Sequence, residues 1–270
     1  MRFDRRWAAC GFLMVCLSMP ARADLSYLNK GTIGYTMASA LPTKPMAQGA
    51  LDVHLSPAYA EFKGNESDPG LKASGPGFGA SVLYSLTDHW GIGGLIGYAK
   101  MRGTDSNSDR FTATGYSAGA NIVYDPFSGD NFRFPIMAGL AYDNDKETVN
   151  VGNAAFGQFP ANSVFQYYVG KSPGWIAGLA PQFNTGPLRW VVFGFAIQPF
   201  HKPVINNPNA GSNNGSDGGA SGAGVSVIYR PLNMALTYIP SFANDVGHGE
   251  TNSVYAINYQ QRFQLGLAGQ

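Results

Sequence analysis

Large apolar residues alternate with small residues along much of the chain. From Gly77 to Leu86 every second position is Gly or Ser apart from one Leu, and the alternation restarts at Trp90 and runs to Met101. A period of two is typical of a strand with two unlike faces, and the short break between the two runs is typical of a tight turn. The pattern predicts a β-hairpin over residues 77–101.

The larger side chains of this hairpin are aromatic at its ends and aliphatic in its middle. On the second strand, Trp90 and Tyr98 enclose Ile92 and Ile96. This distribution is expected of a wall whose outer face meets hydrocarbon and whose rims meet lipid headgroups. The hairpin is therefore interpreted as part of an outer-membrane barrel.

The same alternation recurs in segments of about the length that a membrane-crossing strand needs. We predict an all-β fold, a closed antiparallel transmembrane β-barrel of about ten strands, with eight or twelve strands as the alternatives. Besides the two strands of the hairpin, the predicted strands are Ala50–Ala60, Gly115–Tyr124, Phe132–Tyr142, Trp175–Asn184, Leu188–Gln198, Ala220–Arg230, Asn233–Ile239 and Asn252–Phe263.

Short and long connections alternate between these strands without a break. Short turns follow the second, fourth, sixth and eighth strands, and long polar loops follow the odd-numbered ones. Short periplasmic turns, long extracellular loops and an even strand number are the rule for bacterial outer-membrane barrels, so both termini are expected in the periplasm. Lys146–Val151 and Ser163–Val169 are interpreted as extensions of the fifth and sixth strands above the membrane, tipped by Gly152–Asn162.

Four prolines interrupt the pattern: Pro57, Pro135, Pro181 and Pro240 lie inside or at the ends of predicted strands. A closed barrel has no edge strand on which a missing N–H could face solvent. Bulges or local frays are therefore expected at these positions.

The N-terminal residues have the form of a secretory signal peptide. Three arginines precede an apolar run from Trp7 to Met19, and Ala21–Ala23 fits a small-x-small cleavage site. We expect residues 1–23 to be the signal peptide, residues 24–48 a periplasmic strap, a plug or a disordered leader, and residues 49–270 the barrel. The alternatives are a lipoprotein processed at Cys16 and an uncleaved anchor, although about thirteen apolar residues are few against the roughly twenty of a spanning helix.

Composition excludes several classes of function. Both cysteines, Cys10 and Cys16, fall in the predicted signal peptide, so the mature chain would have no disulfide, thiolate metal site or Cys nucleophile. Cleavage removes four of the 18 basic and one of the 17 acidic residues, which leaves 14 and 16 and a net charge of −2. A near-neutral chain without a basic run is not expected to bind nucleic acid. No loop has the spacing of a phosphate or calcium site, so no cofactor and no metal are expected.

Three features together resemble the broad group of small bacterial outer-membrane β-barrel proteins. They are the signal sequence, the turn sequence Tyr84–Gly91, and the closing alternation of Tyr255, Ile257, Tyr259 and Phe263. The resemblance implies residence in the outer membrane of a Gram-negative-type bacterium, and the lipid of that membrane and the barrel assembly machinery as partners. In such proteins the last strand commonly ends at a C-terminal aromatic residue, whereas here seven residues follow Phe263.

A barrel of ten strands also resembles the omptin outer-membrane proteases, which use paired aspartates and an Asp-His pair at the outer rim. The nearest residues are Asp245 and His248, with Asp105 and Asp109 in an earlier loop, but the expected Asp-x-His spacing is absent. Solvated loop charges are the simpler interpretation, and we expect no catalytic residue and no enzyme activity. Asp88–His89 falls in a predicted periplasmic turn, where such a pair is more often turn chemistry.

Polar residues on the inward face are the candidate functional residues. On the first strand, Asp52, His54 and Ser56 share the inward face. They suggest either an interior hydrogen-bonding network or, as the alternative, a lipase-like or deacylase site. Four charged residues near the periplasmic end are expected to form a cluster, and the small residues elsewhere are expected to leave space for a conduit or for the N-terminal segment. The predicted lumen-lining residues are Asp52, His54, Ser56, Ser81, Asn121, Arg133, Arg230, Asn258 and Arg262.

The sequence favours two functions of different classes. The first is passive, porin-like transport of small, partly apolar solutes, because the predicted interior is small-lined and weakly charged. The second is a structural or surface-interaction barrel that acts through its extracellular loops, because residues 152–162 and an Asn- and Gly-rich loop at residues 206–224 would protrude. A secreted soluble β protein is a third possibility.

Overall fold

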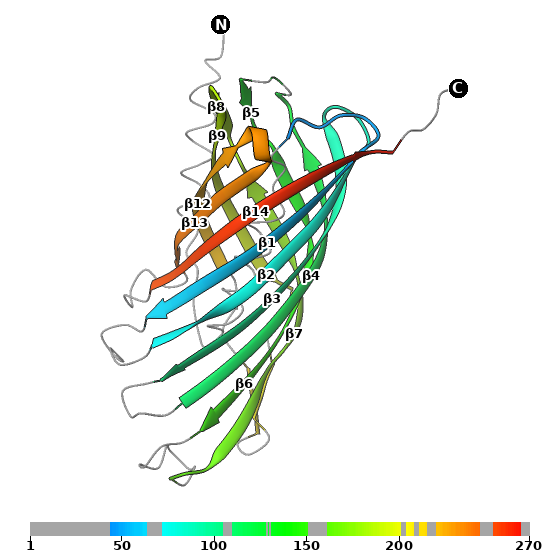
Figure 1. Ribbon diagram of the computed structural model, residues 1–270. Helices are drawn as coiled ribbons and strands as arrows, with labels where there is room; N and C mark the ends of the chain where they lie inside the picture. The colour runs from blue at the N-terminus through cyan, green and yellow to red at the C-terminus, as the bar shows by residue number, and fades with distance from the viewer. Residues whose placement is uncertain are drawn as a thin grey trace, which may run out of the picture.

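One antiparallel sheet that closes on itself makes up the computed structural model (Figure 1). It describes residues 44–63, 72–104, 110–127, 129, 131–150, 161–200, 204–207, 211–214, 220–243 and 251–265. Across these residues no helix has the length and hydropathy that a bilayer crossing requires.

Ten long strands form the wall, and four short ones extend it. Two of the short strands, β5 and β8, continue β6 and β7 at one end, and β10 and β11 form a hairpin at the other. The elements are β1 (Ala50–Lys63), β2 (Lys72–Ser85), β3 (Trp90–Thr104), β4 (Arg110–Tyr124), β5 (Phe132–Arg133), β6 (Ile136–Asn150), β7 (Val164–Leu179), β8 (Gln182–Thr185), β9 (Leu188–Pro199), β10 (Val204–Asn207), β11 (Gly211–Asn214), β12 (Ala220–Tyr229), the 3₁₀ turn η1 (Arg230–Leu232), β13 (Met234–Ala243) and β14 (Thr251–Gln264).

Two pairings close the ring. The first strand pairs with the last, with Leu55 opposite Tyr259, and β7 pairs with β9 across the interruption made by β8, with Ile176 opposite Ile197. Every other long strand pairs with its neighbour in sequence. The prediction of a closed barrel of ten strands is confirmed, and the alternatives of eight and twelve are wrong.

The outward face of the wall carries large exposed apolar side chains, whereas a water-soluble protein buries most of its large apolar residues. Along β2, the outward Phe78 and Val82 are exposed while the inward Ser81 and Leu83 are buried. Leu236 on β13 is 66% exposed and is surrounded by further exposed apolar side chains. Such a face is stable only against hydrocarbon, which supports the assignment of this surface to lipid.

Aromatic residues mark both ends of the outward face. The rings of Trp90 and Tyr124 lie 4.4 Å apart beside the short turns, and those of Tyr238 and Tyr255 lie 5.1 Å apart toward the long loops. These rows correspond to the aromatic girdles that transmembrane barrels place at the two interfaces.

The short turns lie at one end of the barrel and the long connections at the other (Figure 1). At the short-turn end, Gly186 and Asn233 adopt positive φ angles of 62° and 51°, which the tight reversals before β9 and β13 require. We assign this end to the periplasm by the rule for bacterial barrels.

At the opposite end, β6 and β7 run beyond the other strands (Figure 1). Their pairing continues to Asn150 opposite Val164, which confirms the predicted extension of the fifth and sixth strands. The hairpin of β10 and β11 adds to this extension through Ile205, which lies opposite Val169. Residues 152–160 of the predicted tip lie outside the described residues.

Prolines break or shift the strands as the sequence predicted. Pro135 separates β5 from β6, Pro181 separates β7 from β8, and the two breaks lie side by side because Ala180 N donates to Pro135 O at 2.9 Å. The β12–β13 register shifts next to Pro240, and the β1–β14 pairing skips Pro57. The predicted fifth and sixth strands are thus each divided in two, because proline has no N–H to donate to the ladder.

Glycines that face inward lie where a side chain has no room. A Cβ on Gly139 would lie 2.1 Å from the carbonyl oxygen of Ala120, and one on Gly93 would lie 2.7 Å from Asn121 Oδ1. On the outward-facing Gly94, the nearest atom would be 3.7 Å away. The expectation that small inward residues leave open space is wrong at Gly139 and Gly93, because neighbouring strands of the curved wall fill that space.

This crowding predicts a difference between inward and outward glycines. Gly139→Ala is expected to destabilise the barrel by about 1–3 kcal/mol, the usual cost of overpacking, whereas Gly94→Ala is expected to stay within about 0.5 kcal/mol of the parent. Urea unfolding of both variants in lipid vesicles, followed by Trp fluorescence, measures the difference. Equal unfolding midpoints would contradict it.

Candidate functional site: the lumen

The lumen has one polar wall and one apolar wall. The polar wall lies on β12, β13, β14, β1 and β2, where buried polar residues point inward among apolar ones such as Ile239 and Val254. These polar residues are Ser226, Thr237, Asn258, Gln260, His54, Ser56 and Ser81. Facing it in the ring, β9 turns Val191, Phe193, Phe195 and Ile197 inward, and β7 adds Ile176 and Leu179. Val191 and Phe193 therefore face the lumen, and Val192 between them faces outward.

Hydrogen bonds connect the side chains of the polar wall across β12, β13 and β14. Ser226 Oγ and Thr237 Oγ1 lie 2.5 Å apart, and the amide of Asn258 also donates to Thr237. Next along the wall, His54 lies opposite Gln260 on one side and opposite Ser81 on the other. The result is a polar band across five neighbouring strands.

Several buried atoms of this band have no hydrogen-bond partner. They include His54 Nε2, Ser56 Oγ and both terminal atoms of the Gln260 amide. A buried polar group left unpaired costs about 1–3 kcal/mol, so each of these atoms would gain from a water or solute that reached it. No hydrogen bond joins His54 Nε2 to Ser56 Oγ, and the lipase-like alternative stays a prediction.

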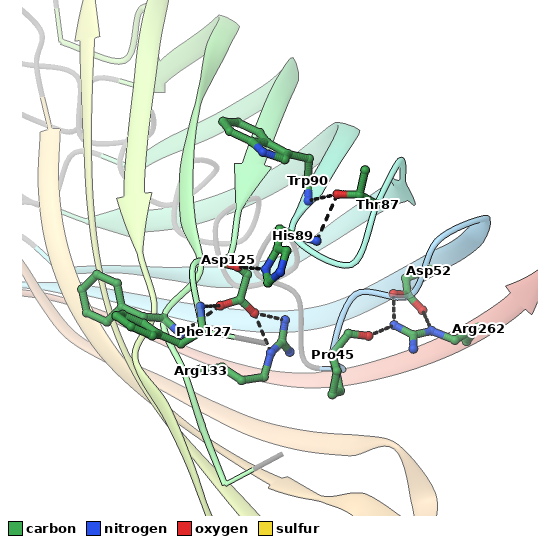
Figure 2. A network of polar contacts seen from close by, with 10 residues as sticks. Pro45, Asp52, Thr87, His89, Trp90, Asp125, Phe127, Arg133 and Arg262 are labelled. Atoms are coloured by element: carbon green, nitrogen blue, oxygen red, sulfur yellow. Dashed lines mark hydrogen bonds and ion pairs between the residues drawn. The ribbon is translucent and has the colours of Figure 1, made fainter. Parts of the chain in front are cut away.

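A bidentate ion pair lies at the periplasmic mouth. Arg262 Nε donates to Asp52 Oδ1 at 2.7 Å, and Arg262 Nη2 donates to Asp52 Oδ2 at 2.6 Å and to the carbonyl of Pro45 at 2.6 Å (Figure 2). Charge-assisted pairs with two parallel bonds are the strong ones. This pair therefore joins β1 to β14 and also holds the segment that precedes β1.

The preceding segment, Lys44–Gly49, lies at the mouth beside β14, β2 and the turn between β2 and β3. Met46 is only 3% exposed, Gln48 N donates to Asp88 Oδ1 at 3.1 Å, and Gly49 N donates to Ser85 O at 2.9 Å. Burial lowers the pKa of the Lys44 ammonium below its ordinary value, the charge of Arg262 lowers it further, and Asp52 opposes the shift. Only residues 44–48 of the predicted strap or plug are described, so its role stays a prediction for residues 24–43.

A second ion pair is fully buried in the turn between β4 and β5. Arg133 Nε donates to Asp125 Oδ2 at 2.7 Å, and Phe134 N donates to Asp125 Oδ1 at 3.1 Å (Figure 2). Both side chains are at most 1% exposed. Asp125 was missed from the sequence, because an Asp before Pro126 in a polar turn resembles ordinary turn chemistry.

The pair Asp88–His89 serves the turn between β2 and β3. Thr87 Oγ1 accepts hydrogen bonds from His89 N at 3.1 Å and from Trp90 N at 2.9 Å, and His89 Nδ1 lies 2.8 Å from the carbonyl of Asp125 (Figure 2). His89 thus connects this turn to the turn after β4, and Asp88 connects it to the segment Lys44–Gly49 by accepting from Gln48 N. Both roles agree with the prediction that Asp88–His89 is turn chemistry.

One of the predicted lumen residues is misplaced. Arg230 is exposed in η1, with Nη1 3.5 Å from Gly186 O, because Pro231 ends β12 before it could point inward. Arg262 is partly buried at the mouth, and the single charged cluster expected from sequence is two separate pairs. The remaining predicted residues are buried: Asp52, His54, Ser56, Ser81, Asn121, Arg133 and Asn258.

The predicted protease residues cannot be placed. Asp105, Asp109, Asp245 and His248 all lie outside the described residues. Within the residues that the structure describes, no group of three or more His, Cys, Asp or Glu side chains could hold a metal ion.

Because the ion pair of Asp125 and Arg133 is buried, removing one partner is expected to lower the free energy of unfolding by a large amount. Asp125→Asn leaves the Arg133 guanidinium buried without its counter-charge, and we expect a loss of about 3–5 kcal/mol. Urea unfolding in vesicles measures it, with the exposed Glu61→Gln as the matched control. The double variant Asp125→Asn/Arg133→Met is expected to recover most of the loss, and a double variant no more stable than Asp125→Asn would contradict the pairing.

Solved structures with a similar fold are bacterial outer-membrane proteins and a related translocator. The outer membrane protease OmpT from Escherichia coli is 11% identical, with 79% of this chain and 95% of that chain covered and a TM-score of 0.40. The translocator domain of the autotransporter NalP from Neisseria meningitidis is 12% identical (79% and 90% covered, TM-score 0.48). The outer membrane protein OprG from Pseudomonas aeruginosa is 12% identical (82% and 99% covered, TM-score 0.36). We carry no activity over from them.

The comparison with curated proteins gives no match. The family described as "outer membrane protein beta-barrel domain" matches residues 33–230, which is most of the chain. That match agrees with the closed wall, the apolar outer face and the aromatic rows. The chain belongs to the outer membrane protein beta-barrel domain family, which places it in the outer membrane of Gram-negative bacteria.

Proposed function

We propose that this barrel lets small uncharged solutes cross the outer membrane slowly through its lumen. The observation that carries the proposal is the polar wall opposite an apolar wall, with buried polar atoms of His54, Ser56 and Gln260 left without partners. A solute with both hydroxyl and hydrocarbon groups could exchange contacts with both walls.

Charge pairing favours uncharged solutes over ions. The carboxylates of Asp52 and Asp125 are each matched by one guanidinium, so the two pairs add no net charge to the lumen. An ion that entered would lose hydration, which is costly in a low-dielectric interior, and these two pairs offer it no free counter-charge. We therefore expect the lumen to pass uncharged solutes faster than ions.

Passage is expected to be slow because side chains fill the lumen. Phe193 and Phe195 are at most 2% exposed, and Met46 is buried at the periplasmic mouth. A solute must displace these side chains to pass, and their rearrangement would limit the rate of passage. Truncating them should therefore speed passage.

Liposome swelling with the purified mature protein tests this function. Glycerol is expected to enter faster than a salt of similar size, and Phe193→Ala/Phe195→Ala should raise the glycerol rate several-fold. Val192→Ala, on the outward face of the same strand, is the matched control and should leave the rate unchanged. Barrels that stay closed in swelling and in planar-bilayer conductance, both with and without residues 24–48, would refute the proposal.

A second candidate function is surface interaction through the extracellular extension. The hairpin of β10 and β11 extends the sheet beyond β7, and within the described residues β11 pairs only with β10. A strand with one unpaired edge can accept a further strand from another chain. Contact between barrels on neighbouring cells would be one use of such an edge.

Cell aggregation tests this second candidate. Bacteria that display the parent protein should aggregate, and Asn213→Pro on β11 should reduce aggregation, because proline cannot donate to an added strand. Folding of the barrel, read from heat-modifiable migration, and glycerol passage should both stay unchanged. Aggregation at the parent level would exclude the β11 edge.

A further inference from the structure

A hollow of about 710 Å³ lies on the outward face of the barrel, over β1, β12, β13 and β14. The side chains of Pro57, Val227, Leu236 and Ile257 line it, and all four alternate outward, away from the lumen. Leu236 and Ile257 are register partners, so these residues lie side by side. We refer to this site as the outer hollow.

Three tyrosines form one row of the lining. Tyr59 and Tyr238 each lie opposite Tyr255 in the strand register. The hydroxyl of Tyr59 donates to Ser74 Oγ at 2.9 Å, and the rings of Tyr238 and Tyr255 stack at 5.1 Å. The row is thus held by contacts within the protein.

The outer hollow lies close to the extracellular boundary of the hydrocarbon. On β1, exposed Glu61 and Lys63 follow two and four residues beyond Tyr59. Charged side chains on the lipid face are tolerated near an interface and costly at the midplane. The tyrosine row therefore marks the interface, and the outer hollow belongs to the outer leaflet.

An apolar group from the bilayer is the occupant that suits such a site. The outer hollow is continuous with the lipid-facing wall, and an empty hollow would forfeit the dispersion contacts that its lining could make. A second copy of the barrel fits poorly, because a two-fold contact needs a self-complementary patch and a concave patch offers nothing that projects. We propose that the outer hollow binds an acyl chain of an outer-leaflet lipid as a fixed ligand.

Native mass spectrometry of barrels extracted from outer membranes in mild detergent tests this site. The parent protein is expected to retain one outer-leaflet glycolipid per barrel. Val227→Trp fills the outer hollow and should lower the retained fraction several-fold. Ile122→Trp makes a similar change on the lipid-facing wall of β4, away from the outer hollow, and should retain the lipid at the parent level.

The alternatives give different masses. No lipid on the parent protein, or equal retention by Val227→Trp and the parent, would overturn the site. A retained phospholipid would overturn the leaflet assignment, and a dimer that only Val227→Trp loses would assign the outer hollow to a second copy. Heat-modifiable migration identifies folded barrels, and because Val227 faces away from the lumen, glycerol passage should not change in either variant.

Discussion

The bilayer core offers no water to the backbone, and the wall of this barrel is shaped by that constraint. Every N–H and C=O in hydrocarbon needs a partner in the protein, which is why the ring closes through β1 with β14 and through β7 with β9. The prolines show the same constraint locally. Pro135 and Pro181 lie side by side where two strands break together, and the ladder resumes beyond them with β9, β8 and β5.

A closed wall of ten strands leaves a narrow interior, and two matched pairs of charges lie in it. Asp52 with Arg262, and Asp125 with Arg133, each bring a carboxylate and a guanidinium together at the periplasmic end. Higher in the lumen, the polar wall carries side chains such as Ser56 and Gln260, and some of their buried atoms have no hydrogen-bond partner. The interior is therefore polar enough to interact with a solute, yet it presents no fixed net charge from these pairs.

The period of two in residues such as Phe78, Val82 and Ile96 was sufficient to predict the strand number and the lipid-facing side, because burial in a barrel depends mainly on parity. The alternation wrongly predicted that Arg230 points inward, because the chain turns at Pro231 before it could do so. The alternation also could not reveal Asp125, because its partner Arg133 comes close only through the turn between β4 and β5. Nor could it show that Gly93 and Gly139 are small because neighbouring strands crowd them. Curvature of the wall, which no short sequence window records, decides those positions.

The pair of Asp52 and Arg262 joins residues 210 positions apart in the chain. Contacts of such high sequence separation form late, because the entropy of closing the loop must be overcome before the contact contributes. Until the last strand arrives, β1 has an open edge, and the segment Lys44–Gly49 at the mouth lacks its Arg262 anchor. Joining of the ring and anchoring of this segment are thus one cooperative event, which makes a chain truncated before β14 an aggregation-prone open sheet and not a smaller barrel.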